Sequence, residues 1–178
     1  LPVTIKPYTS NKGAGVGVNL QDEAAVRAAY AQARAITRHV MVERHIPGYV
    51  HRLLVVGGQV VAATRGQYPG GQHDPRAKVV TVDCTAQVHP EVAYMATLAA
   101  KVVGLDIAGV DLVCTDIGQP LDAQGGAILE VNAGPGLLMH LQPTQGVPQP
   151  VGEAIVQHLF PAGDTGHTDK DGMAARIP

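Results

Sequence analysis

The sequence predicts an α+β domain of mixed or antiparallel sheets flanked by helices. Two observations carry this prediction. Short apolar runs of strand length are separated mainly by turns, which favours hairpins, and three segments show the spacing of amphipathic helices. The 178 residues are 46% hydrophobic and 16% charged, so the chain is long and apolar enough to bury a core.

The N-terminal part of the chain is predicted to contain one helix between strands. The helix runs from Asp22 to Ile36, where apolar side chains recur at helical spacing and acidic residues at its start suit the helix dipole. Residues 8–19 form a polar, glycine-rich loop, and Gly57-Gly58 is typical of a two-residue hairpin turn. The apolar helix positions are Val26, Ala29, Tyr30, Ala33 and Ile36. The strands predicted here are Val3–Lys6, His39–Glu43, Val50–Val56 and Gln59–Thr64.

The C-terminal part follows a polar stretch at residues 65–78. A helix begins at Pro90, a favoured first position, and ends at Gly104. Its apolar stripe is predicted to be Met95, Leu98, Ala99 and Val102. The strands predicted here are Val79–Cys84, Ile107–Cys114 and Ala127–Asn132, and a last helix covers Val151–Leu159. Residues 1–160 are expected to form one domain, and residues 161–178 a linker. We interpret the chain as a fragment of something longer and expect it to have little or no enzymatic activity by itself.

The strongest chemical signal is a set of oxygen-bearing side chains on two neighbouring strands. Glu130 and Asn132 share one strand face, and a hairpin would bring Asp111 beside them. Two carboxylates and an amide oxygen are the ligands that Mg²⁺ prefers. The glycine-rich segment 133–136 follows at once and lets a ligand approach the backbone. The alternative is a solvated strand face, and the pattern favours the metal site.

Two N-terminal segments have the composition of a nucleotide site. Glycines in the segment 10–17 allow backbone N–H groups to fold over phosphate oxygens, although a plain flexible loop explains them equally well. Lys6 is placed to supply a point charge for a phosphate, or simply to face water at a strand end. Glu43 ends an apolar strand, where backbone groups and a carboxylate suit an aminopurine, but a plain strand exit explains it better by itself. Arg52 interrupts the next apolar strand and is expected to face a polar cleft or, alternatively, the solvent.

Composition excludes several other classes of function. The formal net charge of −2 provides no basic field for a nucleic-acid backbone, and Trp is absent. No apolar run of about 18 residues is present, so no membrane-spanning helix is expected. Cys84 and Cys114 lie in apolar strands and are expected to be buried thiols of a cytoplasmic protein.

Taken in order, these segments resemble the ATP-grasp ligases. Within that superfamily, three long segments look like the ATP-grasp domain of cyanophycin synthetases. They are residues 51–58 (HRLLVVGG), 103–111 (VGLDIAGVD) and 130–136 (EVNAGPG), and shorter agreements occur at 89–91 and 139–141. The resemblance covers about residues 1–65 and 80–160. It implies an incomplete ATP-grasp fold, with a linker that leads toward a Mur-ligase-like domain.

The resemblance also implies a chemistry and a set of partners. ATP phosphorylates a carboxylate, and an amine displaces the phosphate to form an amide, which adds aspartate to a polymer primer in a cytoplasmic homo-oligomer. The residues assigned to bind the ATP phosphates are Lys6, Lys12, Gly13, Gly15 and Gly17. The residues assigned to the hinge that binds adenine are Glu43, His45 and Ile46. Arg52 faces phosphates or the acyl group and is assigned as catalytic, and magnesium is bound by Asp111, Glu130 and Asn132.

The sequence departs from this pattern in three places, one of which is that family members are expected to begin well upstream, with an extra domain and the first part of the nucleotide lobe. Val50 stands where the family carries a carboxylate for the ribose, and only residues 65–78 join two strands that the family separates by a long insertion. Two alternatives therefore stay open. One is another ATP-grasp ligase, of the glutathione or D-alanyl dipeptide type. The other is a non-catalytic nucleotide-binding or structural fragment.

Overall fold

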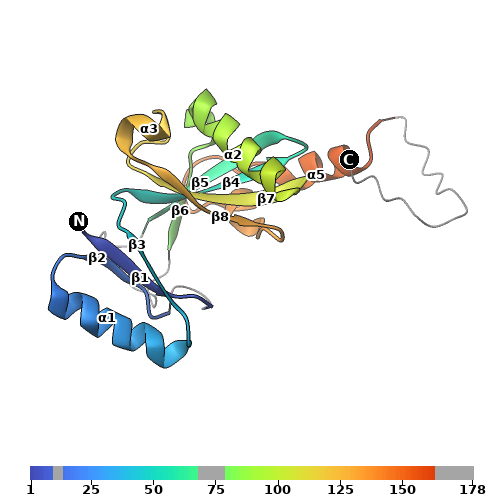
Figure 1. Cartoon of the computed structure of the whole chain (residues 1–178). Coiled ribbons are helices and arrows are strands. Elements are labelled where there is room, and N and C mark those ends of the chain that lie inside the picture. Colours follow the sequence, from blue (N-terminus) through green and yellow to red (C-terminus); the bar gives the residue numbers. More distant parts are fainter. Residues whose placement is uncertain (10–13, 68–78, 163–178) are drawn as a thin grey trace, which may run out of the picture.

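The computed structural model describes residues 1–9, 14–67 and 79–162, which form two lobes (Figure 1). The smaller lobe is N-terminal and contains a three-stranded sheet with one helix. The larger lobe contains a five-stranded sheet with helices on both faces. Residues 45–48 connect the last strand of the small lobe to the first strand of the large one.

The small lobe is a sheet of order β2-β1-β3, covered by α1. Both strand pairs are antiparallel. Its elements are β1 (Val3–Pro7), β2 (Gly17–Leu20), α1 (Glu23–Ile36) and β3 (Val40–Arg44). Asp22 caps α1 by accepting a hydrogen bond from the backbone N–H of Ala25. Ile5, Ala29 and Ala33 are buried between helix and sheet.

The large lobe is built on a sheet of order β6-β5-β4-β7-β8 in which every pair is antiparallel. The strands are β4 (Tyr49–Val56), β5 (Gln59–Gln67), β6 (Val80–Asp83), β7 (Ile107–Cys114) and β8 (Ala127–Asn132). Gly57 and Gly58 join β4 to β5 with φ of 57° and 77°, the left-handed conformation that a two-residue hairpin turn requires.

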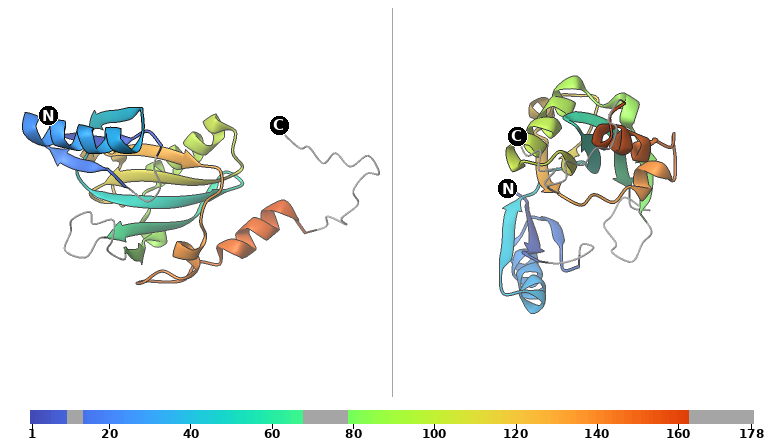
Figure 2. Two further views of the ribbon diagram at one scale, coloured as in Figure 1. Left: turned by 90° about the horizontal axis from the view of Figure 1, so that it is seen from below. Right: turned by 90° about the vertical axis from the view of Figure 1, so that its right-hand side faces the viewer.

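Helices pack on both faces of this sheet (Figure 2). One face lies against α2 (Pro90–Val103) and buries the larger cluster, including Leu53, Val110 and Leu112. The other face carries Leu54 and Val56, which pack with Val151 of α5 (Val151–Leu159). The short elements are η2 (Thr85–Gln87), α3 (Leu121–Gln124) and α4 (Leu138–Leu141).

Most predicted elements are present, and the α+β class with antiparallel sheets is confirmed. The glycine-rich loop was predicted to reach residue 19, but β2 begins at Gly17. The predicted polar stretch begins too early, because β5 extends to Gln67. Residues 68–78 and 163–178 lie outside the described residues.

The predicted apolar stripe of α2 is wrong. The buried positions are Val92, Ala96 and Ala100, whereas Met95 and Val102 are exposed. The physical reason is close packing, since alanine side chains let the helix lie near the sheet and turn the larger apolar residues outward. In α1, likewise, Ala29 and Ala33 are buried and Tyr30 is half exposed. No helix in the described part of the chain is long and apolar enough to cross a membrane.

Candidate nucleotide and metal site

A line of polar residues crosses the large sheet in register. Glu130 lies opposite Asp111, Asp111 opposite Arg52, Arg52 opposite Thr64, and Thr64 opposite Asp83. Residues directly opposite each other in an antiparallel pair point to the same face. These five residues, one from each strand, are called the polar row below. The row lies on the face opposite α2, which is otherwise lined by apolar residues.

Arg52 and Asp111 form the centre of the polar row. The guanidinium makes two parallel hydrogen bonds to the carboxylate, one from Nη2 to Oδ2 at 2.8 Å and one from Nε to Oδ1. The two side chains are 20% and 13% exposed, so little solvent screens them. The hydrogen bond to Asp111 raises the pKa of Arg52. This fork geometry fixes the guanidinium in one orientation on the sheet.

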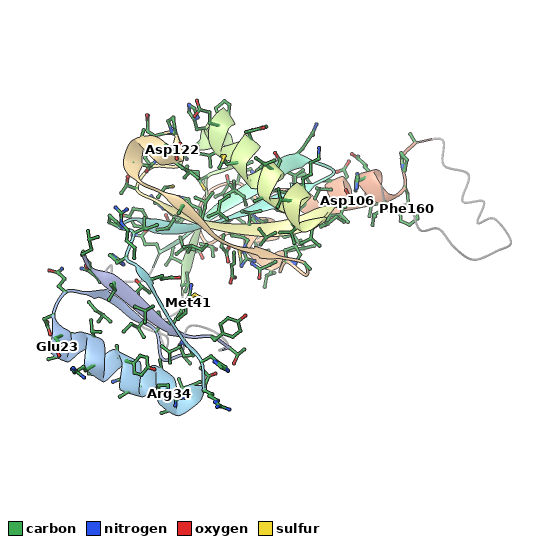
Figure 3. All side chains as sticks on the ribbon, in the orientation of Figure 1. Glu23, Arg34, Met41, Asp106, Asp122 and Phe160 are labelled. Carbon is green, nitrogen blue, oxygen red and sulfur yellow. The ribbon has the colours of Figure 1, made fainter. Side chains whose placement is uncertain are left out.

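Asn132 joins the two predicted carboxylates. Its Nδ2 donates to Glu130 Oε1 at 3.1 Å and approaches Asp111 Oδ2 at 3.4 Å. The same nitrogen donates to the carbonyl of Gly109 at 3.3 Å. The structure therefore brings Asp111, Glu130 and Asn132 together as the sequence predicted, and it adds Arg52 to the same cluster. Figure 3 draws the side chains of both lobes in the orientation of Figure 1.

Gly109 is a residue that the sequence analysis missed. A Cβ at this position would lie 2.9 Å from Pro135 Cβ and 3.2 Å from both Cδ and Nη1 of Arg52. Glycine is therefore required for Arg52 to lie across β7 and for the segment after β8 to pack beside it. The signal was a glycine inside a strand two residues before a predicted ligand.

The donor set fits a hard cation. Both carboxylates lie within hydrogen-bonding reach of the Asn132 amide nitrogen, and the amide oxygen is the third atom that could bind a cation. Within the described ranges, no group of three His, Cys, Asp or Glu residues forms a metal site, so such a site depends on the amide of Asn132. Both oxygens of Asp111 accept from Arg52, and a cation would have to share this carboxylate.

Lys6 and Glu43 form a second charged cluster, on the sheet of the small lobe. Lys6 Nζ lies 2.9 Å from Glu43 Oε1, and the two side chains are 29% and 32% exposed. Thr4, opposite Glu43, makes a hydrogen bond between its Oγ1 and His45 Nδ1 at 3.2 Å. The backbone N–H of His45 donates to the Pro2 carbonyl at 3.0 Å, which fixes the start of the connection between the lobes.

The positions of the other predicted nucleotide-binding residues say less about a nucleotide site. Ile46 is partly buried in the connection. Gly15 and Gly17 pack closely on the small lobe, since a Cβ would lie 2.4 Å from Ile36 Cδ1 or 2.8 Å from Ala29 Cβ. Close packing on α1 thus accounts for these two glycines. Lys12 and Gly13 lie outside the described residues.

Comparison with known proteins decides the family. The RimK-like ATP-grasp domain matches residues 1–147 of the chain. The chain belongs to the RimK-like ATP-grasp family. Enzymes of this family are ATP-dependent carboxylate–amine ligases. Cyanophycin synthetase from Nostoc sp. is 32% identical over 228 residues, covering 93% of this chain and 25% of the relative. The resemblance to cyanophycin synthetases is confirmed, and the chain spans 25% of that relative's length.

A shorter relative aligns differently with this ATP-grasp chain. A probable alpha-L-glutamate ligase from Alkalilimnicola ehrlichii is 30% identical over 162 residues, covering 89% of this chain and 49% of the relative. The Nostoc alignment, at 228 residues, is longer than the 178-residue chain, so that relative contains segments without a counterpart here. The glutamate ligase alignment leaves little room for such gaps.

Solved structures confirm the ATP-grasp fold. The bifunctional glutathione synthetase from Pasteurella multocida superposes with a TM-score of 0.62 at 20% identity, covering 90% of this chain and 31% of that chain. D-alanine–D-alanine ligase from Bacillus anthracis gives a TM-score of 0.58 at 17% identity, covering 78% of this chain and 45% of that chain.

The sequence analysis of this ATP-grasp domain missed part of the polar row and its surroundings. Asp83 accepts hydrogen bonds at Oδ1 from Thr85 Oγ1 at 2.7 Å and from Gln149 Nε2 at 3.2 Å. His140, in α4, is 0% exposed. Strand alternation would have placed Thr64 on the same face as Leu54. No local sequence pattern indicates that α4 packs against the sheet.

Proposed function

We propose that this chain is the catalytic domain of an ATP-dependent carboxylate–amine ligase that uses Mg²⁺. The observation that carries the proposal is the register of Arg52, Asp111 and Glu130 on adjacent strands, with Asn132 bonded to the two carboxylates. An arginine, two carboxylates and an amide in one cluster suit phosphoryl transfer, in which catalysis consists mainly of positioning and charge neutralisation.

The two charged clusters have complementary tasks in this proposal. Asp111, Glu130 and Asn132 hold the magnesium ion, which would neutralise phosphate charge. Arg52 orients the phosphate or the acyl group with the guanidinium that Asp111 now fixes. In the small lobe, Lys6 contacts phosphates, and Glu43 with His45 and Ile46 borders the adenine. Val50 is 48% exposed and stands two residues before Arg52, so an apolar surface replaces the ribose carboxylate of the family.

The proposed reaction has two steps. A carboxylate oxygen of the acyl substrate attacks the γ-phosphorus of ATP, and ADP leaves. An amine then attacks the carbonyl carbon of the acyl phosphate, phosphate leaves with the bonding electrons, and the nitrogen loses one proton to give the amide. The chain's own residues contribute orientation, since holding two reactants in near-attack geometry lowers the barrier by several kcal/mol.

The amine substrate is proposed to be aspartate, added to the end of a polymer primer in the cytoplasm by a homo-oligomer. The similarity to cyanophycin synthetases supports it. A second candidate is glutamate, because the alignment with the Alkalilimnicola ehrlichii glutamate ligase leaves little room for gaps. The glutathione and D-alanyl dipeptide types have only fold-level similarity in their favour.

The experiment offers the purified chain ATP, Mg²⁺ and a short cyanophycin primer with labelled aspartate or labelled glutamate. By itself the chain is expected to have little or no ligase activity, and whatever ATP-dependent incorporation occurs is expected to favour aspartate over glutamate. Preference for glutamate would move the chain to the second candidate. If neither amino acid is incorporated while Mg²⁺-dependent nucleotide binding persists, the chain is a nucleotide-binding domain without this ligase activity.

Lys6→Ala tests the small lobe in the same assays. Loss of a charge-assisted hydrogen bond, worth about 1.5–3 kcal/mol, should weaken ATP binding by at least about tenfold and adenosine binding hardly at all. Lys101→Ala, an exposed lysine at the end of α2, is the matched control and should change neither. Equal losses for ATP and adenosine would remove Lys6 from the phosphate site.

A further inference from the structure

His140 is a buried histidine whose ring has no hydrogen-bond partner. Its exposed fraction is 0%, and within the described residues neither Nδ1 nor Nε2 has a partner. A neutral imidazole has one N–H donor and one acceptor nitrogen. Leaving such groups buried and unpaired is destabilising, so a fully apolar residue would serve better if the site only needed filling.

The surroundings place His140 beside the polar row. Its backbone carbonyl accepts from the N–H of Gln149 at 2.9 Å, and the Gln149 side chain donates to Asp83 at 3.2 Å. Asp83 is the β6 end of the row, two strands from Arg52. The two charged groups that act on the imidazole are Arg52 and Asp83. Burial, with the Arg52 charge as a smaller cause, lowers the pKa of His140 to about 4, so the ring is neutral near pH 7.

Arg52 will need a second acceptor if Asp111 binds a cation. In the structure, the Asp111 carboxylate accepts hydrogen bonds from Nε and Nη2 of Arg52. A cation on Asp111 occupies oxygen lone pairs that these donors use now. Arg52 has five N–H donors and no acceptor of its own, and its side chain is only 20% exposed, so water is a limited substitute.

We propose that His140 is a positioning residue for Arg52, the neutral acceptor that takes an N–H of the guanidinium when Asp111 turns to its cation. This inference rests on the proposed function, because it assigns His140 a task only in the Mg²⁺-bound state. It explains why a buried polar group is kept unpaired within electrostatic range of the partly buried guanidinium of Arg52. The cost in stability is retained because it keeps Arg52 oriented after its first partner is engaged.

The test compares His140→Leu with His140→Gln by calorimetric titration with ADP, in Mg²⁺ and in EDTA, and by urea unfolding without ligand. Leucine removes the acceptor, whereas the glutamine carbonyl keeps one. We expect His140→Leu to weaken ADP binding about tenfold in Mg²⁺ and to leave binding in EDTA unchanged. We expect His140→Gln to bind within about threefold of the wild type. Without ligand, the leucine variant should be at least as stable as the wild type.

His51→Leu is the matched control. His51 is 2% exposed and lies on the opposite face of the sheet, where its Nδ1 is 2.9 Å from the Tyr49 carbonyl. This variant should lose stability and keep the Mg²⁺ effect. Wild-type ADP binding by His140→Leu, or equal losses in the leucine and glutamine variants, would overturn the role of His140. Absence of any Mg²⁺ effect in the wild type would overturn the proposed function and, with it, this inference.

Discussion

The two faces of the large sheet are made by the same strands and differ completely. Under α2, residues such as Leu53, Val110 and Leu112 form the largest apolar cluster of the described chain. On the opposite face, the neighbouring residues Arg52 and Asp111 belong to the polar row. Each strand therefore contributes alternately to the core and to the candidate site.

The division between the two faces lets a small domain carry a charged site without losing its fold. Burying the α2 face makes the sheet rigid, and this rigidity fixes the spacing of the polar row on the other face. Both faces depend on the register between β4 and β7. A slip by one residue would move the core side chains to the site face and the site side chains to the core face. Substitutions on one face therefore test whether the other face keeps its structure and its binding.

The largest stability effect is expected when the central ion pair is broken. Arg52→Leu leaves the Asp111 carboxylate buried without its partner, which should cost about 3–5 kcal/mol in the free energy of unfolding. The double variant Arg52→Leu/Asp111→Leu removes both charges and should recover most of this loss while abolishing the Mg²⁺ effect on nucleotide binding. Urea unfolding measures both. A double variant no more stable than Arg52→Leu would show that the polar face contributes packing rather than a charge pair.

The next largest loss of stability is expected from a substitution on the apolar face. Leu53→Ala opens a cavity beneath α2 at a position that is 0% exposed, and should cost about 2–5 kcal/mol. If the faces are divided as described, the folded fraction of this variant should keep the wild-type Mg²⁺ effect on ADP binding. Loss of that effect at a temperature where the variant is folded would mean that the core face also shapes the site directly.

A smaller loss of stability is expected at acidic pH, because each face of the large sheet buries one neutral histidine. Burial lowers the pKa of His51 and that of His140 from 6.5 to about 4. Between these values the unfolded chain binds more protons than the folded chain, so stability falls as the pH is lowered from 6.5 toward 4. From pH 7 to pH 5 each histidine should contribute about 2 kcal/mol to this loss. Urea unfolding of His51→Leu at both pH values should show a smaller loss than the wild type, and an unchanged loss would contradict the buried neutral state.

The sequence predicted what depends on local pattern. Strand alternation placed Glu130 and Asn132 on one face, and a hairpin placed Asp111 beside them, as the structure has them. Helical spacing failed for α2 because most of its sequence is apolar, so the pattern did not define which side faces the sheet; the small residue Ala96 decides it. His140 could not be predicted, because its burial depends on how α4 reaches the sheet.

Glu130→Gln tests whether the polar row binds a magnesium nucleotide. The substitution keeps the shape of an exposed side chain and removes one charge, so the free energy of unfolding should change by less than about 0.5 kcal/mol. In calorimetric titrations the wild type is expected to bind ADP more tightly in Mg²⁺ than in EDTA, and Glu130→Gln to bind with the same affinity in both. If the variant retains the full Mg²⁺ effect, the cation does not bind at Glu130 and the polar row is not the magnesium site.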